Sequence, residues 1–126
     1  MSRSSALFNC LIRTHHITSR KKVQRVRRAA DQLNVDYLLM RSGGSPGLMF
    51  AESRDEVGLA EWVAAVQALR YKDFQCLRKP AVTVGSSLVQ SNGFQEVDNT
   101  AAFSQEMEAR GLTRWWRKAM GYASDD

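Results

Sequence analysis

The chain has 126 residues, of which 44% are hydrophobic and 25% charged, and it carries a formal net charge of +5. These values describe one ordinary globular domain that buries roughly two-thirds of the surface of its unfolded chain. No apolar run approaches the roughly 20 residues that a membrane span requires, and Cys10 and Cys76 are too few for a disulfide framework or a zinc site. We therefore expect a monomeric protein of a reducing compartment, cytoplasmic or nuclear, with no signal peptide and no membrane contact.

The first half of the chain alternates between strand and helix patterns. Leu7 to Ile17 alternates imperfectly and is polar on both sides only at its C-terminal end, which predicts a central strand with one solvated end. From about Ser19 to Leu33, apolar residues recur at helical spacing. Ser19 is the expected N-cap of this helix, and Asn34 is its expected left-handed stop.

The sequence predicts two further strands, at Val35 to Met40 and Leu48 to Glu52. The short glycine-rich turn between them, Ser42 to Gly47, indicates that they form a hairpin. We expect Ser53 to cap the second helix, with Glu56 completing a capping box. The apolar side of this helix is predicted to consist of Val57, Ala60, Trp62, Val63, Val66 and Leu69.

A fourth strand is predicted from Phe74 to Leu77, continuing unevenly to Val84 around Pro80, which favours the edge of a sheet. A polar loop is expected over Gly85 to Gly93. Two helices should follow, at Asn99 to Arg110 and Thr113 to Met120, and Gly111 and Gly121 end them. These two helices contain too much apolar surface to be left in solvent. Their large apolar residues are Phe103, Met107, Leu112, Trp115, Trp116 and Met120.

This element order predicts an α+β fold, a ferredoxin-like split βαβ sandwich with a four-stranded antiparallel sheet and two crossover helices. The expected spatial order of the strands is fourth, first, third, second, which places Cys10 and Cys76 on neighbouring strands as reduced thiols. The second face of the sheet would otherwise be bare, so the C-terminal helical pair should cover it. We expect residues 1–126 to form a single domain, with 98–122 as a helical extension packed on it.

Catalytic and cofactor chemistry has little support in the sequence. His15 and His16 are neighbours on a strand and should point to opposite faces, so they cannot chelate one metal together. We expect one of them to pack under a helix and the other to lie at the solvated strand end. Ser86 and Ser87 lack a nucleophile elbow, and Gly43 to Gly47 lacks the lysine of a phosphate loop. We expect no metal, no cofactor and no enzymatic activity.

The most distinctive feature is the basic first helix. Lys21, Lys22, Arg25 and Arg28 should face solvent, opposite the apolar stripe. Cations in a first turn oppose the helix dipole at a cost of a few tenths of a kcal/mol each. These four basic residues either only keep the helix surface hydrated or form a binding surface for a negatively charged partner. The predicted nucleic-acid-binding residues are Arg13, His15, His16, Arg20, Lys21, Lys22, Arg25 and Arg28.

The aromatic residues lie on helical apolar stripes and are expected in the core, so this surface would hold RNA through its phosphates. The competing interpretation is a protein-interaction adaptor, in which the same surface meets an acidic protein partner.

Several segments resemble known proteins in order and spacing. They are Thr14-His15-His16-Ile17, Ser19-Arg20-Lys21-Lys22, Gly44-Ser45-Pro46-Gly47, Leu48-Met49-Phe50-Ala51-Glu52, Trp62, Leu69-Arg70-Tyr71, Gly93-Phe94-Gln95-Glu96 and Leu112-Thr113-Arg114-Trp115-Trp116. Together they resemble the domain of unknown function that follows the RWD domain in RWD domain-containing proteins. They are also similar to the C-terminal domain of spliceosomal pre-mRNA-processing factor three, a small nuclear ribonucleoprotein component.

The resemblance spans roughly residues 10 to 122 and implies a ferredoxin-like fold. Its splicing-factor branch implies binding of small nuclear RNA, structured or single-stranded, at a duplex with a single-stranded extension. Its RWD-linked branch implies no established activity, and leaves open whether an RWD domain precedes this segment in a longer protein. The family has lysine where Ser45 stands and tryptophan where Tyr71 stands.

Overall fold

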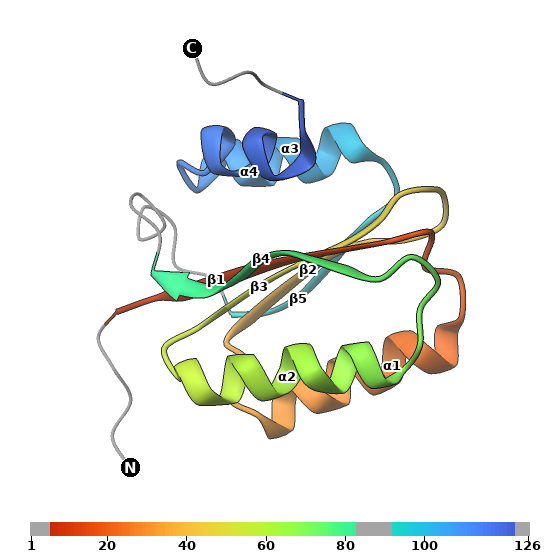
Figure 1. Cartoon of the computed structure of the whole chain (residues 1–126), viewed down its shortest axis with the longest axis vertical. Coiled ribbons are helices and arrows are strands. Elements are labelled where there is room, and N and C mark those ends of the chain that lie inside the picture. Colours follow the sequence, from red (N-terminus) through yellow and green to blue (C-terminus); the bar gives the residue numbers. More distant parts are fainter. Residues whose placement is uncertain (1–5, 83–91, 123–126) are drawn as a thin grey trace.

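The computed structural model describes residues 6–82 and 92–122 and shows an α+β protein of three layers. One pair of helices lies on each face of a central sheet (Figure 1). The elements are β1 (Phe8–Thr14), α1 (Arg20–Gln32), β2 (Tyr37–Arg41), β3 (Gly47–Ser53), α2 (Glu56–Ala68), β4 (Gln75–Val82), β5 (Gly93–Val97), α3 (Thr100–Ala109) and α4 (Thr113–Met120). No helix in the described ranges is both long and apolar enough to cross a membrane.

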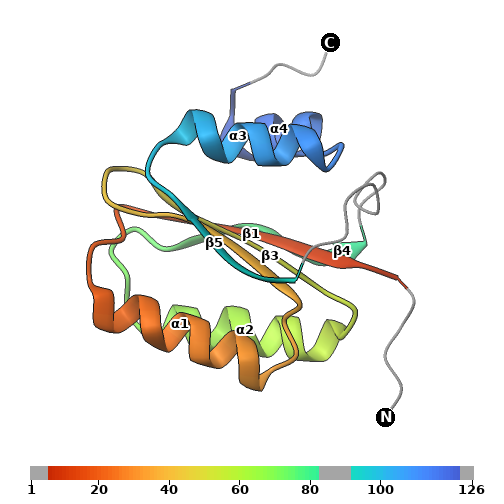
Figure 2. The same ribbon diagram turned by 180° about the vertical axis from the view of Figure 1, so that it is seen from behind.

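The sheet has five strands in the order β4-β1-β3-β2-β5. The order predicted for the first four strands is confirmed, and these four pair antiparallel. The prediction of a four-stranded, fully antiparallel sheet was wrong, because β5 adds to β2 in parallel, from the pair Tyr37–Gly93 to the pair Arg41–Val97. Figure 2 shows β5 in cyan along this edge. The sheet is therefore mixed.

The opposite edge is formed by β4, which contains Pro80, as the sequence predicted. An edge position tolerates proline because the missing N–H would face solvent. The pairing of β1 with β4 shifts register on both sides of Leu11. The predicted continuation of this strand past Leu77 is confirmed as far as Val82. Its last two residues, Thr83 and Val84, lie outside the described residues, as do Ser86, Ser87 and most of the predicted loop from Gly85 to Gly93.

The predicted helix boundaries are confirmed for α1 and wrong for the start of α2. The Ser19 hydroxyl accepts a hydrogen bond from the backbone N–H of Lys22 at 3.2 Å, and Asn34 has a φ of 65° just beyond the helix. Ser53, however, is the last residue of β3, and Asp55 caps α2 by accepting from the N–H of Gly58 at 2.9 Å. Because the cap is two residues later than predicted, Glu56 begins the helix and forms no capping box.

The apolar face of α2 also differs from the prediction. Val57 is 62% exposed and Ala60 is exposed, whereas Leu59 is fully buried. Successive residues turn by about 100° on a helix, and the buried stripe runs through Leu59, Trp62 and Val66. Val57 and Ala60 lie on the far side of that stripe.

Two separate hydrophobic clusters hold the layers together. The first lies between the sheet and α1 with α2, and here the Trp62 indole donates to the carbonyl of Val26 at 3.2 Å. The second lies between the opposite face and α3 with α4, where the ring centres of Phe103 and Trp116 are 5.0 Å apart and Phe50 meets Trp115 edge-on. Trp116 is 1% exposed, so the prediction that at least one of the adjacent tryptophans is buried is confirmed.

The two cysteines lie on β1 and β4, which are neighbours, and both are free thiols, as predicted. Burial raises the pKa of Cys10 well above its ordinary value, and the nearby Cys76 adds to this effect. Burial also raises the pKa of Cys76. Because the thiolate is the nucleophilic form, burial suppresses the reactivity of both residues.

Candidate nucleic-acid interface

The helix α1 concentrates the charge of the protein. It contains six of the 18 Lys and Arg residues of the chain and one of its 13 Asp and Glu residues. Its net charge of +5 therefore equals that of the entire chain, and the remaining basic and acidic residues cancel. The first turn holds no acidic residue to offset the helix dipole.

Three of these cations form what we call the α1 basic face, defined as Lys21, Arg25 and Arg28. All three side chains are exposed, at spacings of four and three residues that place them on one side of the helix. The opposite side is fixed in the first core by Val23, Val26 and Ala30. Within residues 6–82 and 92–122, no carboxylate forms an ion pair with the α1 basic face. These charges are thus directed at solvent from a rigid support.

Two predicted binding residues lie on the flanks of α1 and contact other parts of the protein. Lys22 is half-buried, and its Nζ lies 4.9 Å from the centre of the Tyr71 ring. Arg20 donates two hydrogen bonds to the carboxylate of Glu96, at 2.7 and 3.0 Å. The hydrogen bond from Arg20 lowers the pKa of Glu96, which also accepts from the Ser42 hydroxyl. The expectation that Lys22 shares the exposed face was therefore wrong.

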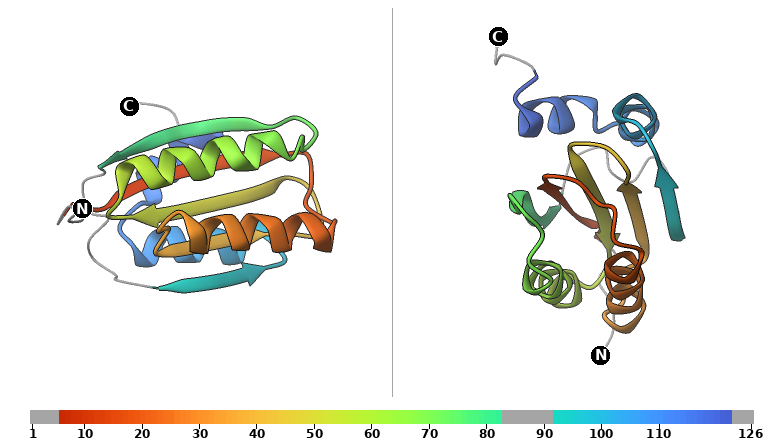
Figure 3. Two further views of the ribbon diagram at one scale, coloured as in Figure 1. Left: turned by 90° about the horizontal axis from the view of Figure 1, so that it is seen from below. Right: turned by 90° about the vertical axis from the view of Figure 1, so that its right-hand side faces the viewer.

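Arg27 is a basic residue that the sequence reasoning left out. Its guanidinium lies 4.3 Å from the centre of the Phe94 ring on β5. Arg20 and Arg27 are seven residues apart, so they lie on the same flank of α1, and both contact β5. Figure 3, left, shows α1 beside β5, and α2 beside β4. The seven-residue spacing was visible in the sequence, but the strand that these arginines contact was not predicted.

The two histidines lie in the connection between β1 and α1. Because β1 ends at Thr14, their rings do not diverge as on a strand. The ring centres are 4.8 Å apart, and both side chains are exposed. The expectation that one of them packs under a helix was wrong. His15 Nδ1 lies 3.6 Å from a carboxylate oxygen of Asp73. In the described part of the chain, no group of three His, Cys, Asp or Glu side chains is placed to hold a metal ion.

Arg13 lies on the other side of the sheet from α1. It is two residues beyond Leu11, which belongs to the second core, and strand side chains alternate between faces. Its Nη2 donates to Oε1 of Gln75 at 2.6 Å.

The eight predicted residues therefore divide into four groups. The α1 basic face is free for a ligand, Arg20 and Lys22 hold neighbouring elements, the histidines lie beside the N-terminal end of α1, and Arg13 lies behind the sheet. Comparison of the sequence with models of protein families and with curated protein sequences found no match.

Proposed function

We propose that this protein is a non-catalytic RNA-binding module whose contact surface is the α1 basic face. The observation that carries the proposal is the location of the entire net charge on one helix, with Lys21, Arg25 and Arg28 exposed and without ion-pair partners in the described residues. Lys21 lies in the first turn, where a cation opposes the helix dipole, so helix stability alone does not favour its position. The resemblance to a small nuclear ribonucleoprotein domain favours RNA as the polyanion.

Binding at the α1 basic face would act through phosphates rather than through bases. The α1 basic face contains no aromatic side chain on which a base could stack, and cations at helical spacing contact a sugar–phosphate backbone regardless of sequence. His16, which is exposed beside the start of α1, extends this surface toward the end of the sheet. We therefore expect affinity that depends strongly on salt and weakly on RNA sequence.

The test is a triple variant in which Lys21, Arg25 and Arg28 are replaced by glutamine. Lys22 and Arg20 stay intact because they contact Tyr71 and Glu96. Each lost phosphate contact to a single strand flattens the slope of log K against log salt by about 0.7. Three lost contacts flatten it by about 2, which at about 0.1 M salt corresponds to a loss of roughly 100-fold in affinity. Fluorescence anisotropy with a labelled RNA between about 50 and 200 mM salt measures both quantities.

A matched control removes the same charge elsewhere, by replacing Lys79, Arg114 and Lys118 with glutamine on β4 and α4. Both variants should keep the melting temperature of the wild type, and the control should keep most of its RNA affinity. An equal loss in both variants would show that only net charge matters and would contradict the proposal. A wild-type protein that prefers an acidic polypeptide or heparin to structured RNA would instead support the adaptor interpretation.

A further inference from the structure

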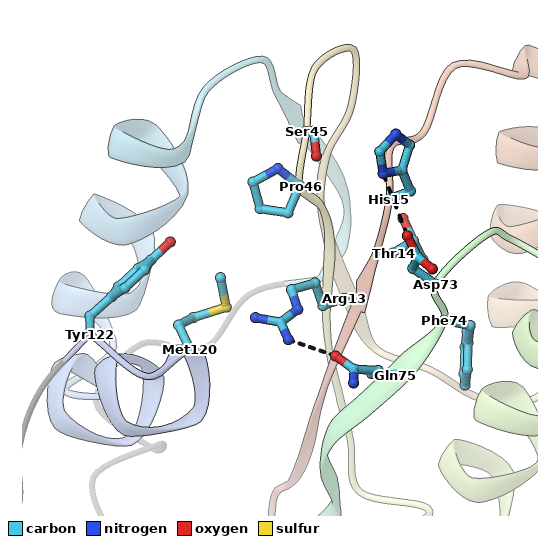
Figure 4. A pocket seen from close by; sticks show the side chains of 10 residues that line it. All are labelled: Arg13, Thr14, His15, Ser45, Pro46, Asp73, Phe74, Gln75, Met120 and Tyr122. Atoms are coloured by element: carbon cyan, nitrogen blue, oxygen red, sulfur yellow. Dashed lines mark hydrogen bonds and ion pairs between the residues drawn. The ribbon is translucent and has the colours of Figure 1, made fainter.

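A cavity of about 600 Å³ opens at the end of the sheet where α4 stops, on the face opposite α1 (Figure 4). Four segments that are distant in sequence supply its walls: the end of β1, the β2–β3 hairpin, the start of β4 and the end of α4. Its volume lies within the about 300–1,000 Å³ of sites for small organic ligands. Its lining includes Arg13, His15, Ser45, Gln75, Met120 and Tyr122.

Arg13 supplies positive charge to this cavity. In Figure 4 its side chain extends from β1 toward Met120, across the opening. The hydrogen-bond partner of its guanidinium is the neutral amide of Gln75, at 2.6 Å. A guanidinium has five N–H donors, and no carboxylate pairs with Arg13 in the described ranges. The nearby carboxylate of Asp73 instead faces His15, at 3.6 Å. The Arg13 guanidinium can therefore bind an anion such as a phosphate by donating hydrogen bonds to it.

The wall opposite the β1 end is apolar and aromatic. Tyr122 is 47% exposed, and its ring meets Trp116 edge-on with ring centres 5.9 Å apart. Its backbone is fixed, because its N–H donates to the carbonyl of Arg117 at 2.8 Å and its carbonyl accepts from the Arg117 guanidinium at 3.2 Å. Met120 lies beside it and is 8% exposed. A held aromatic ring with an open side is a surface on which a flat heterocycle can stack.

We infer that this cavity binds one nucleoside monophosphate unit. Its phosphate would lie on Arg13, its base on Tyr122, and the polar edge of the base near Ser45. Inorganic phosphate would leave most of the cavity empty, and a nucleoside without phosphate would leave Arg13 without an anion. The inference deepens the proposed function and rests on it, because the nucleotide is either a unit of the bound RNA or the same chemical group in free form.

Isothermal titration of the whole chain with adenosine monophosphate, adenosine and inorganic phosphate tests the cavity directly. The nucleotide should bind more tightly than either fragment. Arg13→Gln should weaken nucleotide and phosphate binding by about 10- to 100-fold while leaving adenosine unaffected. Tyr122→Ala should weaken nucleotide and adenosine binding by about 5- to 100-fold while leaving phosphate unaffected. Arg114→Gln serves as the control, because this exposed arginine on α4 does not line the cavity.

Backbone amide shifts in the wild type provide a readout that needs no variant. The nucleotide should shift the amides of His15, Ser45, Gln75 and Tyr122. No shift at these amides, or equal affinity for the nucleotide and inorganic phosphate, would overturn the inference. Competition by the nucleotide against a single-stranded RNA would identify the ligand as a unit of the strand, and independent binding would identify it as a free nucleotide.

The α1 triple variant separates the two proposals. It should lose RNA binding and keep nucleotide binding, because α1 lies on the other face of the sheet. If the α1 triple variant loses RNA binding but the wild type never binds the nucleotide, the inference about the cavity alone is overturned. If the wild type binds the nucleotide but the α1 triple variant keeps its full RNA affinity, the proposed function alone is overturned.

Discussion

Replacement of Arg110 by methionine should destabilise the protein, and more strongly at high pH than at low pH. Arg110 ends α3 and is 1% exposed, and its Nη1 donates to Oε1 of Glu52 on β3 at 2.8 Å. Its guanidinium lies between two rings, 4.1 Å from the centre of Tyr37 and 5.5 Å from that of Phe50. The second carboxylate oxygen of Glu52 accepts from the Asn9 amide at 2.8 Å. The substitution leaves a buried carboxyl group with Asn9 as its polar partner.

The direction of the pH effect follows from Glu52. Burial raises its pKa to about 7, although Arg110 and Asn9 both act to lower it. A folded-state pKa above the ordinary value of 4.5 means that protonation favours the folded state. This contribution is complete below about pH 4.5 and is lost as the pH rises through about 7. Without Arg110 the pKa of Glu52 rises further. Above about pH 7 the wild type is therefore stabilised by ionisation of Glu52 beside Arg110, whereas in the variant Glu52 stays protonated and this stabilisation is absent.

The magnitude has two parts. At about pH 5 the carboxyl is neutral in both proteins, and the variant loses mainly the contacts of the guanidinium with the two rings, about 1–2 kcal/mol. Each pH unit above 7 then adds about 1.4 kcal/mol, because one pKa unit corresponds to a tenfold ratio of protonation states. The sum approaches the roughly 3–5 kcal/mol typical of removing one partner of a buried ion pair.

Urea unfolding, followed by the fluorescence of the buried residues Trp62 and Trp116, measures the difference at about pH 5 and about pH 8. The double variant Glu52→Gln with Arg110→Met is the control, since an amide at position 52 cannot ionise. Such an amide can also pair with Asn9, whose Oδ1 has no hydrogen-bond partner in the described residues. Equal destabilisation at both pH values, or a pH dependence that survives in the double variant, would refute this reasoning.

Other substitutions test the architecture. Trp116→Ala should cost roughly 3–5 kcal/mol in the free energy of unfolding, measured by urea, because it empties the centre of the second core. Deletion of residues 98–126 should lower the melting temperature of the whole domain, and a truncated chain that melts like the full one would reduce the tail to an appendage. Asp55→Ala should cost about 1 kcal/mol through loss of the α2 N-cap. Glu56→Ala should cost far less, because Glu56 forms no capping box.

The parts of the fold that the sequence predicts are those with long periodic patterns. The order of β1 to β4, the stop of α1 at Asn34 and the burial of Trp116 follow from alternation, helical spacing and apolar area. The strand β5 was missed because it has five residues, starts at a glycine and is half-buried at best. What fixes it is parallel pairing with β2 and contacts from Arg20 and Arg27, and all of these depend on partners distant in sequence.

The candidate site likewise has a part that local spacing predicts and a part that depends on residues distant in sequence. Spacing alone places Lys21, Arg25 and Arg28 together on one exposed face. It cannot show that Arg20 pairs with Glu96, 76 residues away, or that Lys22 lies on Tyr71. Arg13 and His15 are only two residues apart in the sequence. The cavity that they share is invisible in the sequence, because its other walls come from the hairpin, β4 and α4.

The position of α3 and α4 also determines when this chain can finish folding. The ribosome synthesises the strands β1 to β4 before it synthesises these two helices. In that interval the sheet face that includes Leu39, Leu48 and Phe50 is not covered by α3 and α4. Glu52 also lacks its ion-pair partner, because Arg110 has not yet been synthesised. A nascent chain in this state presents the kind of apolar surface that chaperones bind, so folding of the sheet becomes complete only after translation has passed α4.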